Sequence, residues 1–168
     1  PTSIDLAQNF TFTGTVAGAG GGKVLQVTTS TITGERNVSS TSYEATNIHG
    51  TITPSATTSK VLVLIALPSL YHSSSEAGRL MISRETAVQS VGGSHTGTNV
   101  NNDDMSAYQG GSDLQTGKSG FMFLDSPSTT SAVYYQVYIR NRISNGHFYL
   151  GQGGTPKADV TLMEIGAW

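Results

Sequence analysis

The sequence predicts an all-β protein, an antiparallel jelly-roll-like β-sandwich, and three observations support this prediction. Charged residues make up only 12% of the 168 residues, and no long stretch is rich in the helix formers Ala, Glu, Lys and Leu together. The longest apolar run, residues 61–67, ends at Pro68, and it is too short to cross a membrane as a helix. Between residues 132 and 142 apolar and polar residues alternate, which is typical of a strand with one buried face.

The expected strands can be placed in chain order. Residues 23–31 open the globular part, and residues 43–53 form a kinked or bulged strand that leads to Pro54. Residues 51–58 and 59–71 are expected to form a hairpin-like unit around the central strand. The further predicted strands are residues 79–84, 86–91, 121–125, 132–142, 146–150 and 160–165, and the predicted loops are residues 32–42, 72–77, 92–120 and 151–159.

Residues 1–22 form a separate segment in this prediction, and residues 23–168 form the β-sandwich head. In the segment Phe10, Phe12 and Val16 follow a strand-like alternation, and glycines at 18 and 20–22 make a hinge. The segment either docks on its own domain or ends an intertwined fibre shaft in which identical chains supply the partners. The chain begins with Pro1, so we expect a processed chain or the C-terminal piece of a longer one.

Charge and cysteine content exclude several classes of function. The net charge is −2 and the pI is about 6.1, so the chain lacks the basic footprint of a protein that binds nucleic acid or an anionic membrane. Cysteine is absent, which excludes disulfides and thiolate metal sites. We therefore expect no nucleic-acid partner and no membrane insertion.

Motifs for catalysis and metal binding are incomplete. Residues 92–96 read GGSHT and lack the second glycine of a nucleophile elbow. The alternating oxygen-bearing residues at 99–104 lack the glycine and glutamate that a calcium loop needs. The four histidines are far apart in sequence, and nothing in the sequence brings Asp125 and Glu164 together as a catalytic carboxylate pair. The sequence thus predicts a non-enzymatic protein with no catalytic residues, metal or cofactor.

The long polar stretch 92–120 is the predicted recognition site, at the end of the head away from residues 1–22. Loops on a rigid sheet vary without damage to the core, amide and carboxylate groups bond sugar hydroxyls, and tyrosine offers a stacking face. The alternative is that this stretch is buried between subunits. The candidate receptor-binding residues are Asn99, Asn101, Asp103, Tyr108 and Gln109, with His72 as a neighbour.

Aromatic and apolar residues outside this stretch are candidates for subunit contacts. Soluble chains rarely leave an apolar stripe uncovered, and a closed symmetric assembly would cover the stripe of residues 1–22. Contact with a neighbouring subunit is as plausible for the tyrosine-rich face of strand 132–142 as contact with a ligand. The candidate trimer-interface residues are Phe10, Phe12, Val16, Tyr134 and Tyr138.

Four segments of the chain resemble a known class of proteins. They are GKVLQV at 22–27, ITPS at 52–55 running into SKVLV at 59–63, LDSPSTTSA at 124–132 and TLMEI at 161–165. In this order they resemble the C-terminal domain of tail-fibre and related virion structural proteins of bacteriophages, especially marine phages. The resemblance implies a non-enzymatic homotrimer on the virion surface that contacts other virion proteins and binds a glycan or protein of the host surface. The resembling segments belong to the scaffold of those proteins, so the resemblance identifies no binding residue in this chain.

Three alternatives stay open at this point. A capsid decoration or head-fibre protein fits the same resemblance. A carbohydrate-binding module of a larger secreted protein shares the neutral, aromatic-bearing β-sandwich, but it is expected to be monomeric. A glycan-cleaving tailspike would need a cluster of carboxylates, and the eleven acidic residues are scattered over the chain.

Overall fold

The computed structural model describes residues 23–72, 78–101, 105–107, 114–142, 147–151 and 155–166. Every regular element among these residues is a β-strand, and the strands form two antiparallel sheets. The predicted all-β sandwich is confirmed. Residues 1–22, and with them Phe10, Phe12 and Val16, lie outside the described residues.

The first sheet, called sheet A, is built around β4. This strand pairs with β8 along one side, and with β11 and then β10 along the other; β1 adds to β11, and β2 adds to β10. The bounds are β1 Val24–Thr33, β2 Arg36–Val38, β4 Lys60–His72, β8 Leu114–Asp125, β10 Phe148–Leu150 and β11 Lys157–Ile165.

The second sheet, called sheet B, has β9 at its centre. This strand pairs with β3 on one side and with β5 on the other, and β5 in turn pairs with β6 and β7. The bounds are β3 Glu44–Ile52, β5 Gly78–Glu85, β6 Thr98–Asn99, β7 Met105–Ala107 and β9 Val133–Asn141.

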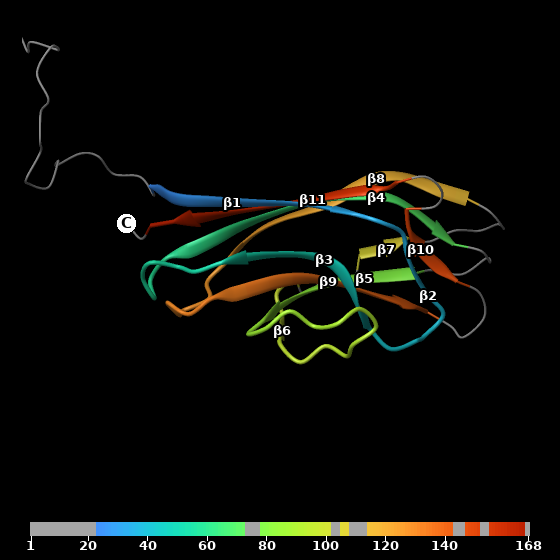
Figure 1. Cartoon of the computed structure of the whole chain (residues 1–168), viewed down its shortest axis with the longest axis horizontal. Coiled ribbons are helices and arrows are strands. Elements are labelled where there is room, and N and C mark those ends of the chain that lie inside the picture. Colours follow the sequence, from blue (N-terminus) through green and yellow to red (C-terminus); the bar gives the residue numbers. More distant parts are fainter. Residues whose placement is uncertain are drawn as a thin grey trace, which may run out of the picture.

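The strand order is that of a jelly roll. Sheet A contains the order β1-β11-β4-β8 and sheet B the order β3-β9-β5, so the first and last strands are neighbours and the chain repeatedly crosses between the layers. Figure 1 shows the two layers stacked, with β1, β11, β4 and β8 above β3, β9 and β5.

The core fills the space between the two sheets. Alternate residues of β4 and β9 point into it, and the close packing includes Gly50 of β3, where an added methyl group would lie 2.6 Å from Val160 Cγ1 of β11. The predicted inward face of residues 132–142 is confirmed. The core-facing residues of these two strands are Val61, Val63, Ile65, Leu67, Leu70, Val133, Tyr135, Val137 and Ile139.

Of two predicted features of the first half, one needs correction and one is confirmed. Residues 51–58 and 59–71 do not form a hairpin-like unit, because β3 belongs to sheet B and β4 to sheet A. The segment between them is a corner that crosses the edge of the sandwich, which lets the apolar faces of both strands meet in the core. The predicted bulge in residues 43–53 is confirmed by a register shift between Ala45 and His49.

The predicted loops contain more strand than expected. β1 extends to Thr33 and β2 lies within 32–42, while β6, β7 and the first half of β8 lie within 92–120. Conversely, residues 86–91 form turns rather than a strand. Backbone hydrogen bonds to β4 hold the Gly- and Ser-rich start of β8, and these bonds do not depend on side-chain pattern.

The two ends of the sandwich differ. Lys23 and Gly166 meet at one end, where Gly166 N donates to Lys23 O at 2.8 Å; this end is called the terminal end, and Figure 1 shows it at the left. The opposite, distal end carries the pairing of His72 with Leu114 and of Gly78 with Ala107.

Candidate functional site

The outer face of sheet B is partly covered by residues 86–97. This segment leaves the end of β5, crosses β9 and reaches the beginning of β3, where Ala45 N donates to Gly93 O at 2.8 Å and Gly92 N donates to Ala45 O at 2.9 Å. Beneath it a small apolar cluster forms from Ala45, Met81 and Tyr138. The covered face is therefore an organised surface and not a bare sheet.

A buried glutamine holds the middle of this segment. Gln136 of β9 donates from Nε2 to Thr46 O at 2.7 Å and to Gln89 O at 2.9 Å, and its Oε1 accepts from Gln89 N at 2.8 Å. The backbone groups of Gln89 are thus bonded by a side chain and not by a strand partner, which explains why the predicted strand 86–91 does not form.

A buried glutamate holds the end of the segment. Glu85 Oε1 accepts from Tyr138 OH at 2.8 Å, and Glu85 Oε2 accepts from Thr96 Oγ1 at 2.8 Å. Burial raises the pKa of Glu85, but the hydrogen bonds outweigh this effect and leave it lowered. Burial and the bond to Glu85 raise the pKa of Tyr138. Tyr138 is 0% exposed, so its predicted place in a trimer interface is wrong: its own chain covers it.

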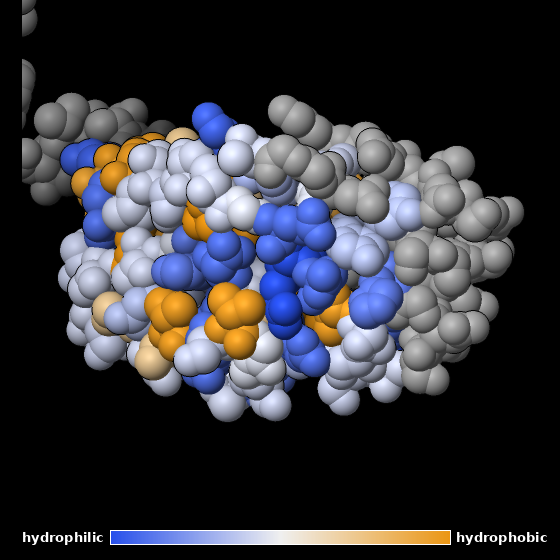
Figure 2. Space-filling view, turned by 45° about the vertical axis from the view of Figure 1, so that its right-hand side comes forward, coloured by the Kyte–Doolittle hydropathy of each residue, from blue (hydrophilic) through white to orange (hydrophobic). Residues whose placement is uncertain are grey.

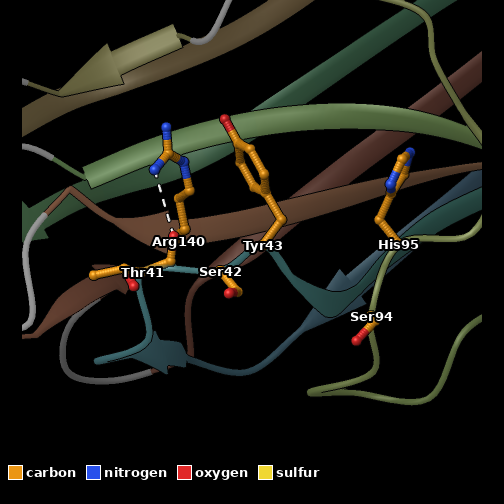
Figure 3. Close-up of a pocket in the computed structure, with 6 residues that line it drawn as sticks. All are labelled: Thr41, Ser42, Tyr43, Ser94, His95 and Arg140. Atoms are coloured by element: carbon orange, nitrogen blue, oxygen red, sulfur yellow. Dashed lines mark hydrogen bonds between the residues drawn. The ribbon is translucent and has the colours of Figure 1, made fainter.

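Beside this covered region lies an open pocket of about 350 Å³, called the Tyr43 pocket. The Arg140 guanidinium lies over the Tyr43 ring, 5.0 Å from its centroid, and its Nη1 donates a long hydrogen bond to Thr41 O at 3.4 Å. Figure 3 shows Arg140 and Tyr43 side by side, with His95 beyond Tyr43 pointing the same way. The lining residues are Thr41, Ser42, Tyr43, Ser94, His95 and Arg140.

His95 is fixed by the covered cluster. Its ring meets the Tyr138 ring edge-on, with centroids 5.8 Å apart and an interplanar angle of 89°. Its Nε2 atom is buried and has no hydrogen-bond partner among the described residues. The histidine is therefore positioned from below by an aromatic contact.

The chemistry of the Tyr43 pocket suits a hydroxylated ligand. A tyrosine ring offers an apolar face for stacking, the guanidinium offers fixed donors and a positive charge, and the hydroxyls of Ser42 and Ser94 donate and accept. These groups lie on three separate segments that packing holds in place. The arrangement can bind a sugar-like or acidic group, and it contains no nucleophile held against a base.

A second pocket, of about 440 Å³, lies where β5 ends and β9 begins. Hydroxyl-bearing side chains of Thr86, Thr96, Thr98, Thr129 and Ser131 line it. It lies at the terminal end, beside the segment that connects β8 of sheet A with β9 of sheet B.

The carboxylates considered as a catalytic pair have separate structural partners. Asp125 Oδ2 accepts from Tyr135 OH at 2.8 Å and from Arg84 Nη1 at 2.5 Å. Glu164 accepts from Ser55 and from Gln26. Each carboxylate ties one element to another through these hydrogen bonds.

Of the six predicted receptor-binding residues, the structure describes Asn99, Asn101 and His72, and their role in binding stays a prediction. Asn101 Oδ1 accepts from Ile82 N at 3.0 Å, and Asn99 Oδ1 accepts from Asn101 N at 3.2 Å, so both side chains support the local chain. His72 ends β4 at the distal end, and its side chain is not described. Asp103, Tyr108 and Gln109 lie outside the described residues. Tyr134 is half-buried on β9, and its role in an interface stays a prediction.

None of the residues that line the Tyr43 pocket was among the candidate site residues named from the sequence. Ser94 and His95 belong to the stretch predicted to carry recognition, whereas Tyr43 was assigned only to a strand. Arg140 lies on the strand predicted at residues 132–142, and the apolar and polar alternation of that strand was the one signal for it. The pairing of Glu44 with Ile139 brings Tyr43 and Arg140 together.

Comparisons with known proteins identify no family for this chain. No protein-family model and no curated protein matches the chain. Among the described residues, acidic and histidine side chains form no group of three that could hold a metal ion, and no helix is long and apolar enough to span a membrane. The class of protein that the geometry defines is a jelly-roll β-sandwich domain with an open, polar surface pocket.

Proposed function

We propose that this chain is the head domain of a phage virion fibre, a tail fibre, which attaches the particle to a glycan or protein of the host surface. In this proposal it acts as a homotrimer on the virion surface and catalyses no reaction. The observation that carries the attachment role is the Tyr43 pocket, where a tyrosine ring, a guanidinium and several hydroxyls meet on the outer face of sheet B.

The position of the resembling segments supports the proposal. The described part of the first segment, residues 23–27, leads into β1, residues 52–55 and 59–63 flank the corner into β4, residues 124–132 connect β8 with β9, and residues 161–165 end β11. Strand pairing brings these four segments together at the terminal end, because Val24 pairs with Ile165, Ile165 with Lys60, and Val61 with Asp125. A common base joined to a shaft, with the Tyr43 pocket toward the distal half, is the arrangement that a fibre head requires.

The test is binding of the purified full chain to a panel of immobilised bacterial surface polysaccharides, both neutral and containing uronic acids, followed by adsorption to the cells that carry the best ligand. Tyr43→Ala and Arg140→Gln are each expected to weaken binding at least tenfold, since each removes a lining group. Val91→Ala is the matched control, because Val91 is 54% exposed and lies outside the Tyr43 pocket. Equal binding of all three variants and the wild type would refute the attachment role of this pocket.

A carbohydrate-binding module of a larger secreted protein is the second candidate, because the Tyr43 pocket would serve it equally well. Sedimentation separates the two, since the module is expected to be a monomer. A capsid decoration or head-fibre protein would instead bind phage particles that lack this chain, and it would bind none of the immobilised polysaccharides.

A further inference from the structure

The outer face of sheet A carries two rows of side chains that strand register aligns. Core-facing residues such as Val63 and Leu162 are fully buried, so their neighbours along each strand point outward. The register joins Val27 to Met163, Met163 to Leu62 and Leu62 to Leu124; in the next row it joins Thr29, Thr161, Leu64 and Met122. The apolar residues of the two rows, together with Leu25, are called the apolar face. They are Leu25, Val27, Leu62, Leu64, Met122, Leu124 and Met163.

Four of the seven residues of the apolar face are exposed, and Leu62, Leu64 and Met163 are half-buried. Met122 is 77% exposed, and Val27 and Leu124 are 52% and 51% exposed, although each is an apolar side chain on a regular strand. A sheet face in contact with water is normally polar, with apolar residues on the core side only. Figure 2 views the sandwich from one side, and hydrophobic groups lie along its upper left margin, at the end where β1 begins. A continuous apolar surface of this kind marks a site of association.

Among the described side chains of these strands, charge on the outer face lies only at the two ends of the rows. Lys60 pairs with Ile165 at the terminal end, and Asp159 pairs with Ala66 beyond the second row. Between these positions the outward residues of β1, β11, β4 and the described side chains of β8 are apolar or threonine. Such a face meets an identical face without repulsion between like charges.

The apolar face also reaches the edge of the sheet. In the part of the chain that the structure describes, β8 pairs only with β4, so its outer edge has no strand partner. An apolar strand at a free edge is prone to associate with another chain. A contact that covers Met122 and Leu124 would cover this edge as well.

The apolar face extends to the first described residues of the chain. Val24 and Leu25, the first residues of β1, are 55% and 48% exposed, and Lys23 precedes them beside Gly166 at the terminal end. Twenty-two residues precede Lys23. If copies are joined along these residues, the faces that begin beside them are brought to the common axis.

From these observations we infer that the apolar face is the surface through which three copies of this chain associate. The inference rests on the proposed trimeric fibre head and adds a surface that was not among the predicted interface residues. Three identical faces packed around a closed axis would bury the rows at the centre and leave each Tyr43 pocket, on the opposite sheet, facing outward.

The test is the mass of the purified full chain in sedimentation velocity at micromolar concentration. The double variant Met122→Glu, Leu124→Glu places two like charges per copy in the apolar face. It is expected to sediment as the 17.6 kDa monomer, with far-UV circular dichroism unchanged because both side chains are exposed. The matched control is Val88→Glu, Val91→Glu, which adds the same charge at side chains that are 42% and 54% exposed outside sheet A; it is expected to remain a trimer.

A trimeric double variant would overturn the inference and leave the proposed trimer intact, whereas a monomeric wild type would overturn both. Cross-linking decides the matter if the double variant does not fold. The chain has no cysteine, so single cysteines placed at 27, 122 or 124 report only their own contacts. A short bis-maleimide is expected to join copies through at least one of these positions and not through Val91→Cys. The reverse pattern refutes the inference.

Discussion

Glu85 and Glu164, two buried carboxylates, fasten irregular segments to the sheets. Glu85 holds Thr96 at the end of segment 86–97, and Glu164 holds Ser55 in the corner between β3 and β4. In both cases neutral hydroxyl or amide groups donate to the charge. A buried carboxylate is tolerated when hydrogen bonds replace its hydration, so these two residues set the geometry of the segments they hold.

Replacing Glu164 by Gln is expected to change the acid sensitivity of the fold. Burial raises the pKa of Glu164, but hydrogen bonds from Ser55 and Gln26 outweigh this effect and lower it to about 2 from an ordinary value of 4.5. Because the folded pKa lies below the unfolded one, the carboxylate stabilises the fold above pH 4.5, and this contribution is lost as the pH falls toward 2. Glu164→Gln is therefore less stable at pH 7, by about 1–3 kcal/mol, and loses less stability on acidification.

Urea unfolding between pH 7 and pH 2.5 measures this difference. Asp159→Asn is the control, because Asp159 is an exposed carboxylate on the same strand. If the wild type and Glu164→Gln lose stability in parallel, Glu164 does not contribute to the acid response.

At the scale of elements, strands with their own apolar pattern were predictable, and strands that depend on a partner were not. β4 and β9 alternate inward apolar residues, so their positions could be read from the sequence. The first half of β8 contains Gly120 and polar residues, and only its ladder with β4 makes it a strand. The Tyr43 pocket could not be predicted for the same reason. The pairing of β3 with β9 brings Tyr43 beside Arg140, and no local sequence pattern predicts that pairing.

The central position of β4 predicts a large cost for shortening its core side chains. Ile65 is 2% exposed and packs between the sheets, so Ile65→Ala is expected to lower the free energy of unfolding by about 2–4 kcal/mol through lost burial and a residual cavity. Val88→Ala, at a 42% exposed position, should change it by less than about 0.5 kcal/mol. Chemical denaturation monitored by circular dichroism gives both values, and an unchanged midpoint for Ile65→Ala would show that β4 is not central.

The distance between the sheets depends on Gly50. A methyl group there would lie 2.6 Å from Val160 Cγ1 and 3.2 Å from Leu162 Cδ1, so Gly50→Ala is expected to destabilise the fold by about 1–3 kcal/mol through overpacking. Val160→Ala alone should also destabilise it, by leaving a cavity. The double variant should be more stable than the sum of the two changes predicts, since each relieves the defect of the other. Additive losses in thermal unfolding would mean that the two positions are not in contact.

At the scale of the whole molecule, the two sheets present different surfaces. Sheet A exposes the apolar face, and sheet B carries the Tyr43 pocket beside residues 86–97, so the proposed association and the proposed ligand binding would use opposite sides of one rigid sandwich. Because the core between them is fully packed, a charge introduced on one outer face need not disturb the other. The two proposed functions are therefore separable by mutation.

This separation predicts how binding changes when assembly is lost. In the proposed trimer three pockets would engage a multivalent surface together, and linked sites raise the apparent affinity by about 10²–10⁴-fold over a single site. The double variant Met122→Glu, Leu124→Glu is expected to lose this gain on immobilised polysaccharide while it binds a short soluble fragment of the same polysaccharide as tightly as the wild type does. Arg140→Gln should weaken both interactions and stay trimeric. Interferometry on the surface and calorimetry with the fragment measure the two affinities, with Val88→Glu, Val91→Glu as the control. If the double variant loses fragment binding as well, the two faces are coupled and the independence argued from the packed core is wrong.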